Sequence, residues 1–79
     1  MMHFDVYSRQ GCHLCEVLIE SLDELLKGRA TMTVHDVDSR DDWRVRFGLR
    51  VPVVRHRDRT VSEFALDRGA IESVLAEKP

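Results

Sequence analysis

The sequence predicts an α/β fold in three layers, α/β/α, with helices on both faces of a four-stranded mixed sheet. Apolar residues alternate in several short segments, as in half-buried strands, and recur at helical spacing in others. These segments follow one another in the order β-α-β-α-β-β-α. A helix joins the first two strands, which should therefore be parallel with a right-handed crossover. A short turn joins the last two strands, which should form an antiparallel hairpin.

The first half of the chain contains two strands and two helices. Residues 3–7 form the first strand, with Phe4 and Val6 on one face, and a polar turn follows. A helix begins at His13 and should end at Gly28. Its apolar stripe consists of Leu14, Val17, Leu18, Ile19, Leu22, Leu25 and Leu26. Residues 32–37 form the second strand. A short helix then runs to Phe47, with Ser39 or Asp41 as its cap and Gly48 after its end.

The second half predicts a hairpin and a final helix. The third strand covers residues 51–54, a charged turn covers residues 55–59, and the fourth strand covers residues 60–64 with Val61 inside. Asp67 can cap the last helix. The apolar positions of this helix are Ile71, Val74 and Leu75. We expect the aromatic residues of the short second helix, Trp43 and Phe47, to pack on the sheet.

Size and charge restrict the function classes. The 79 residues suffice for one domain, residues 1–79. The formal net charge of −2 provides no drive toward nucleic acid or an anionic membrane. No apolar run approaches the ~20 residues that a membrane-spanning helix needs. The first residues lack the basic and apolar regions of a signal peptide, and we therefore expect a cytoplasmic protein.

The two cysteines, Cys12 and Cys15, form a C-x-x-C motif between the first strand and the first helix. A helix N-terminus favours thiolate over thiol, because its unpaired N–H groups and dipole stabilise negative charge. Residues at i and i+3 share a helix face, so Cys15 can resolve a mixed disulfide formed by Cys12. A structural disulfide would not persist in a reducing cytosol. The pair is therefore reactive, metal-binding, or a pair of small buried hydrophobes.

Two segments resemble a known family. They are Tyr7-Ser8-Arg9-Gln10-Gly11-Cys12-His13-Leu14-Cys15 and Arg50-Val51-Pro52-Val53-Val54. Together with the order of the elements, they resemble the glutaredoxins, in particular short bacterial glutaredoxin-like proteins, within the thioredoxin-like fold. The resemblance implies Cys12 as nucleophile and Cys15 as resolving thiol.

The resemblance also implies substrate-binding residues. Arg9 matches a basic residue that helps to hold glutathione. Val51 and Pro52 match the Val and cis-Pro opposite the cysteines, where the Val backbone pairs with a bound peptide or glutathione. Asp67 matches the region that binds the γ-glutamyl end of glutathione. Composition alone favours an ordinary trans proline at the entry to a strand, and the family pattern reverses that expectation.

The chain also departs from the family pattern. Glutaredoxins usually have Gly-Gly before that Asp, whereas this chain has Phe64-Ala65-Leu66 there. Glycines let the backbone approach the tripeptide closely, so the bulkier residues argue against strong glutathione binding. His13-Leu14 replaces the usual Pro-aromatic pair, and His13 is expected either to stabilise the Cys12 thiolate or to be solvated. Val6 replaces the buried acid of many thioredoxins, which favours the glutaredoxins.

Metal and nucleic acid are weaker alternatives. The cysteines with His3, His13 or His35 could complete a zinc site, but no second ligand pair follows at a zinc-binding spacing. We therefore assign no metal ligands. An iron–sulfur cluster shared between two subunits, as in some glutaredoxins, is neither required nor excluded. The arginines of residues 55–59 lack interleaved aromatics and are expected to form a polar hairpin tip.

The sequence thus predicts a small dithiol–disulfide oxidoreductase that reduces protein or glutathione mixed disulfides through Cys12 and Cys15. We expect no bound cofactor, with glutathione as a co-substrate. The expected partner is a disulfide-containing protein or glutathione, without nucleic acid or membrane, and the chain should act as a monomer. The alternative is a binding module of the same fold that holds a peptide strand without redox turnover.

Overall fold

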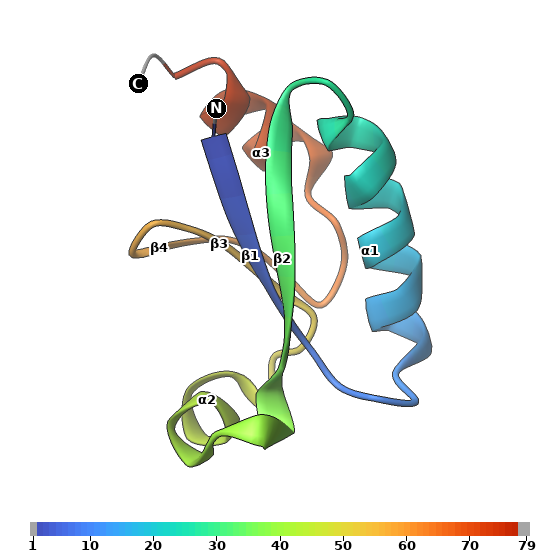
Figure 1. Ribbon diagram of the computed structural model, residues 1–79, viewed down its shortest axis with the longest axis vertical. Helices are drawn as coiled ribbons and strands as arrows, with labels where there is room; N and C mark the ends of the chain where they lie inside the picture. The colour runs from blue at the N-terminus through green and yellow to red at the C-terminus, as the bar shows by residue number, and fades with distance from the viewer. Residues whose placement is uncertain (1, 78–79) are drawn as a thin grey trace.

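A computed structural model describes residues 2–77, which form one mixed sheet flanked by helices (Figure 1). The elements are β1 (Met2–Ser8), α1 (His13–Leu26), β2 (Ala30–Asp36), the 3₁₀ turn η1 (Val37–Ser39), α2 (Asp41–Phe47), β3 (Val53–His56), β4 (Arg59–Glu63) and α3 (Arg68–Leu75). The strand order is β2-β1-β3-β4. This order confirms the predicted α/β architecture.

The two predicted strand directions, parallel for β1–β2 and antiparallel for β3–β4, are confirmed, and the structure adds the pairing of β1 with β3. β1 and β2 are parallel, from Met2 opposite Ala30 to Ser8 opposite Asp36. β1 and β3 are antiparallel, with Tyr7 opposite Val53. β3 and β4 form an antiparallel hairpin, with an irregularity between Val54 and Arg55. The carboxyl end of β1 therefore lies beside the beginning of β3 and the end of β4.

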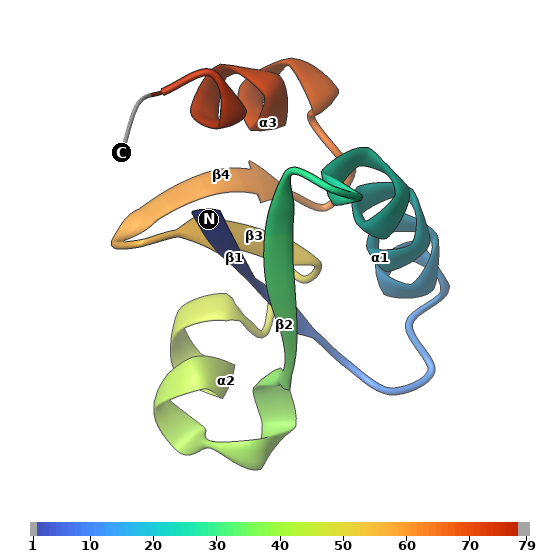
Figure 2. The ribbon, with the colours of Figure 1, turned by 45° about the horizontal axis from the view of Figure 1, so that its top comes forward.

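One face of the sheet is covered by α1 and α3 (Figure 2). The core on this face combines strand side chains with the apolar stripes of both helices. Its buried members are Phe4, Val6, Leu18, Leu22, Leu26, Val54, Ile71 and Val74. Because α1 is fixed along its length by this core, its N-terminal end is held in place beside the sheet.

The opposite face is covered at one end by the seven-residue helix α2. Here Val37, Phe47 and Val53 form a second buried cluster. The ring of Phe47 stacks on Tyr7 with 4.4 Å between centroids. Trp43 meets Tyr7 edge-on at 5.4 Å. The expectation that Trp43 and Phe47 pack on the sheet is confirmed.

The predicted boundaries around β2 and α2 are wrong in detail. β2 begins at Ala30 and ends at Asp36, so Val37 lies in η1 rather than in the strand. Neither proposed residue caps α2, because the Ser39 hydroxyl donates to the carbonyl oxygen of Asp36 and Asp41 is already helical. Arg40 occupies the N-cap position without a side-chain hydrogen bond.

The hairpin also differs from the prediction. Residues 51 and 52 precede β3, which continues to His56, so the turn is only Arg57 and Asp58. His56 remains in the strand because its ring is buried and shares a hydrogen bond with the carbonyl oxygen of His3 at 3.0 Å. β4 ends at Glu63, and Phe64 leaves the sheet with a φ of 65°.

The main helix ends are as predicted. α1 begins at His13, and Gly28 follows its end with a φ of 75° in the left-handed region that glycine adopts freely. Asp67 caps α3 by accepting a hydrogen bond from the N–H of Ala70 at 3.0 Å. Among residues 2–77, none of the helices has the length and apolar character that crossing a bilayer requires.

Candidate active site at the start of helix α1

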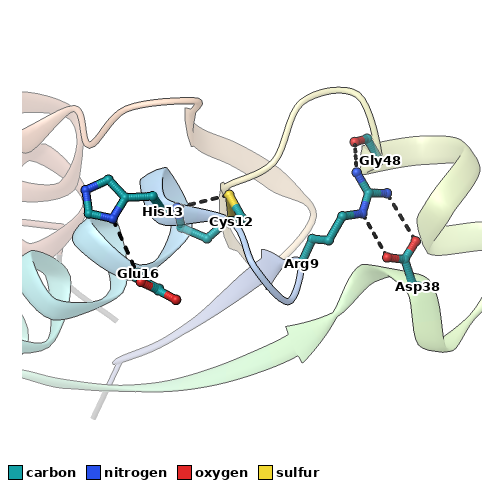
Figure 3. Close-up of a disulfide and its surroundings, with 7 residues drawn as sticks. Arg9, Cys12, His13, Glu16, Asp38 and Gly48 are labelled. Atoms are coloured by element: carbon teal, nitrogen blue, oxygen red, sulfur yellow. Dashed lines mark hydrogen bonds and ion pairs between the residues drawn. A yellow bond between two sulfur atoms is a disulfide. The ribbon is translucent and has the colours of Figure 1, made fainter.

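The two cysteines lie where the turn after β1 enters α1. Figure 3 shows Cys12 at this junction. Cys12 is the N-cap of α1, and Cys15 lies in its first turn. They form a disulfide, with 5.2 Å between their Cα atoms. The Sγ of Cys12 also accepts a hydrogen bond from the N–H of Cys15 at 3.2 Å. One cysteine sulfur is therefore in contact with an unpaired donor of the helix N-terminus, as the motif predicts.

The two cysteines differ in exposure. Cys15 is only 1% exposed, whereas Cys12 is partly exposed. Gly11, with a φ of 75°, lets the turn reverse just before Cys12. The N–H of Cys12 donates to the carbonyl oxygen of Arg9 at 3.3 Å and closes this turn. An incoming molecule therefore meets Cys12 first.

The Val51–Pro52 peptide bond is cis, as the motif predicts. Val53 pairs with Tyr7, so Pro52 comes next to the end of β1, from which the cysteine turn departs. The carbonyl oxygen of Pro52 accepts a hydrogen bond from the N–H of Phe64 at 2.9 Å. The turn after β1, the loop before β3 and the loop after β4 therefore meet at one end of the sheet.

Arg9, in the turn after β1, contacts both η1 and the loop before β3. Its guanidinium donates to both carboxylate oxygens of Asp38, at 2.8 and 3.1 Å, and to the carbonyl oxygen of Gly48 at 3.1 Å. The hydrogen bonding between Arg9 and Asp38 raises the pKa of Arg9 and lowers the pKa of the Asp38 carboxyl. In Figure 3 the guanidinium points away from Cys12 toward Asp38. The structure thus gives Arg9 a positioning contact, and its contact with glutathione stays a prediction.

His13 lies at the first helical position with its side chain 86% exposed. Its Nδ1 is 3.9 Å from a carboxylate oxygen of Glu16. Figure 3 shows the ring turned away from Cys12. Of the two expectations for His13, this placement matches the solvated residue.

The remaining predicted binding residues lie on the segments that meet here. Val51 is partly buried and packs against the cluster beneath α2. Asp67 is exposed and uses one carboxylate oxygen to cap α3. Its second oxygen makes no hydrogen bond among residues 2–77. The roles of Val51 and Asp67 in substrate binding stay predictions.

Three contributors to this region were not found from the sequence. Asp38 and the carbonyl group of Gly48 position Arg9, and Phe64 bonds to Pro52 through its backbone. Nothing in the sequence pairs Arg9 with Asp38, which is 29 residues away. For Phe64, the departure from the family's Gly-Gly was the available signal.

The histidines considered as zinc ligands do not gather at the cysteines. His3 and His35 lie near Asp5, at 3.7 and 2.8 Å from its Oδ1, whereas His13 is on α1. Within residues 2–77, no group of three or more His, Cys, Asp or Glu side chains is arranged to hold a metal ion.

The sheet order, the disulfide before α1 and the cis proline before β3 define a thioredoxin-fold domain with a C-x-x-C pair. The family model described as "Glutaredoxin-like domain (DUF836)" matches residues 4–76. The chain belongs to this family, as the motif predicted. A search of the curated proteins found no match.

Solved structures agree with this assignment. A structural-genomics target protein from X. campestris is 27% identical, with a TM-score of 0.71 over 96% of this chain and 99% of that chain. A malarial protein is 12% identical, with a TM-score of 0.63 over 95% and 93% of the two chains. The germline-specific thioredoxin Deadhead of Drosophila melanogaster is 22% identical, with a TM-score of 0.50 over 95% and 78%. The last two likenesses concern the fold.

Proposed function

We propose that this protein is a dithiol–disulfide oxidoreductase in which Cys12 is the nucleophile and Cys15 the resolving thiol. The observation that supports this most directly is the Cys12–Cys15 disulfide at the N-terminus of α1, with the Cys12 sulfur accepting the N–H of Cys15. Once the disulfide is reduced, this N–H and the helix dipole stabilise a Cys12 thiolate. The thiolate is the form that attacks disulfides.

The reaction proceeds in two exchanges. The Cys12 thiolate attacks one sulfur of the substrate disulfide, forms a mixed disulfide and releases the other substrate sulfur as a thiolate, which takes up a proton. Cys15 then loses its proton and attacks the Cys12 sulfur, which releases the second substrate thiol. Two electrons have passed from the protein to the substrate, and the Cys12–Cys15 disulfide is the product. A thiol donor must return two electrons to complete the cycle.

The unequal burial of the cysteines supports this order of events. A substrate can reach the partly exposed Cys12, whereas Cys15 is 1% exposed and can be reached by the sulfur next to it. The backbone of Val51 precedes Pro52, which comes next to the end of β1 because Val53 pairs with Tyr7. A bound peptide or glutathione would pair with this backbone.

The substrates that we propose are mixed disulfides of proteins or of glutathione. Glutathione would act as a co-substrate, and no bound cofactor takes part in either exchange. We further propose that the protein works as a monomer, because the two exchanges need only the two cysteines of one chain. We also propose that it works in the cytoplasm, where thiols are kept reduced.

A redox titration tests the proposal. The purified protein is equilibrated in glutathione buffers of increasing potential, and the fraction of free thiol is measured by alkylation and mass spectrometry. We expect a reversible two-electron midpoint between about −270 and −120 mV, the range of known dithiol exchangers. We also expect Cys12→Ser to abolish reduction of a model disulfide. No exchange at any potential, with peptide binding retained in Cys12→Ser, would instead establish the binding module.

A further inference from the structure

Phe64 has a backbone conformation that favours glycine. Its φ is 65°, in the left-handed region where a Cβ atom is disfavoured. Two hydrogen bonds hold the backbone there, from the N–H of Phe64 to the carbonyl oxygen of Pro52 at 2.9 Å and from the N–H of Ala65 to that of Glu63 at 2.7 Å. The bend after β4 therefore requires this conformation, and a phenylalanine adopts it at a cost that a glycine would avoid.

Packing does not account for the aromatic side chain. Phe64 is 51% exposed and belongs to neither buried cluster of the described residues. A large apolar side chain that remains in water contributes little to the stability of the fold. A strained backbone that carries such a side chain points to a function for that side chain.

The position of Phe64 suggests what that function is. Its backbone bond to Pro52 places it at the end of the sheet where the cysteine turn begins. Two more exposed apolar residues lie in neighbouring parts of the chain. Leu14, 59% exposed, lies between the cysteines, and Leu49, 95% exposed, follows the Gly48 carbonyl that binds Arg9.

We propose that Phe64 is a specificity-determining residue that selects disulfides whose cysteine has an apolar neighbour over mixed disulfides of glutathione. This inference rests on the proposed function. An apolar neighbour of the substrate cysteine would lose water against the Phe64 ring, which favours its binding. Glutathione carries two carboxylates and an ammonium group, which gain nothing from apolar contacts and lose hydration beside them.

Chromogenic mixed disulfides test the selection. Three thiols are each coupled to thionitrobenzoate: a short peptide with Leu beside its cysteine, the same peptide with Ser in place of Leu, and glutathione. Release of thionitrobenzoate by the reduced protein in a single turnover gives the second-order rate constant for each one. For the wild type we expect the Leu peptide to react about tenfold faster than either of the others, the discrimination that a few methylenes provide.

Phe64→Gly should reduce this preference to about twofold or less, whereas Phe64→Leu should retain most of it. Because glycine suits a φ of 65°, the thermal midpoint of Phe64→Gly should equal or exceed that of the wild type, which excludes misfolding as the cause. Val45→Ser is the matched control, since Val45 is 85% exposed on α2 across the sheet from α1, and its preference should be unchanged.

A Phe64→Gly protein with the wild-type preference for the Leu peptide would overturn the inference, and so would a wild type without that preference. Failure of the proposed function has a different signature. In that case the wild type would release no thionitrobenzoate from any of the three substrates, or Cys12→Ser would release it as fast as the wild type.

Discussion

Arg9 and Asp38, 29 residues apart in the chain, form a two-point ion pair with distances of 2.8 and 3.1 Å. The pair joins the turn before the disulfide to η1, which follows β2. The same guanidinium also donates to Gly48, in the segment that leads to Pro52. One side chain thus connects the turn before the disulfide to η1 and to the loop before Pro52.

The Arg9–Asp38 pair predicts a pH-dependent stability. Arg9 lowers the pKa of the Asp38 carboxyl below its ordinary value near 4. A carboxyl whose pKa is lower when folded contributes stability above its unfolded pKa and loses it as the pH falls through its folded pKa. Asp38→Asn should therefore unfold in less denaturant than the wild type at pH 7, and the difference should shrink toward pH 2.5. Equal differences at both pH values would contradict this role.

Replacement of the resolving thiol should trap the first exchange. Cys15→Ser keeps the partly exposed Cys12, the proposed nucleophile, and removes the thiol proposed to release the substrate. We expect it to accumulate a one-to-one mixed disulfide with a model substrate, seen as an adduct by mass spectrometry and reversed by dithiothreitol. Cys12→Ser should form little adduct in the same time, because Cys15 is 1% exposed. Faster adduct formation by Cys12→Ser would reverse the assigned roles.

Asp67 offers a test that separates capping from substrate binding. Asp67→Ala removes the hydrogen bond to the N–H of Ala70 and should cost about 0.5–2 kcal/mol in the free energy of unfolding. Asp67→Asn keeps an equally good cap and should cost much less. If the carboxylate also binds glutathione, Asp67→Asn should react more slowly with the glutathione–thionitrobenzoate disulfide, and its rates with the two peptide disulfides should not change. An unchanged rate in this stable variant would show that Asp67 acts only as a cap.

Truncation in the core beneath α1 should destabilise the whole protein. Leu22 is fully buried in the cluster that fixes α1 on the sheet. Leu22→Ala should lower the free energy of unfolding by about 2–5 kcal/mol, measured by denaturant titration. Leu49→Ala, at a residue 95% exposed, should change it by about 0.5 kcal/mol at most. Similar losses in both variants would mean that α1 is not held by this core.

Local patterns in the sequence predicted the parts of the fold that depend on them. The Leu18, Leu22 and Leu26 part of the predicted α1 stripe arises from burial on one face, as does the alternation of Phe4 and Val6, and periodicity reports such burial directly. Leu14 and Val17, predicted in the same stripe, are exposed, so that part of the prediction was wrong. The cap at Asp67 was also predicted from local sequence, because an aspartate directly before a helix commonly caps it. The ends of β2 and β3 were predicted less well, because they depend on partners across the sheet. His56 continues its strand through a contact with His3, 53 residues away.

The site was predicted through its motif and not through its surroundings. The C-x-x-C and Val51-Pro52 segments identified both cysteines and the cis bond. The partners of Arg9 could not be found, since a charged turn residue gives no indication of which distant carboxylate it meets. The conformation of Phe64 was also hidden, because an aromatic residue does not indicate a left-handed backbone.

The meeting of three loops at one end of the sheet has a consequence for folding experiments. The cysteines, Pro52 and Phe64 come from separate stretches of the chain and become neighbours once β1, β3 and β4 have paired. A chain in which α1 has formed but these strands have not paired would contain both sulfurs without Pro52 and Phe64 beside them. The proposed thiol exchange should therefore become selective only after β1, β3 and β4 have paired, so its onset during refolding would report that pairing.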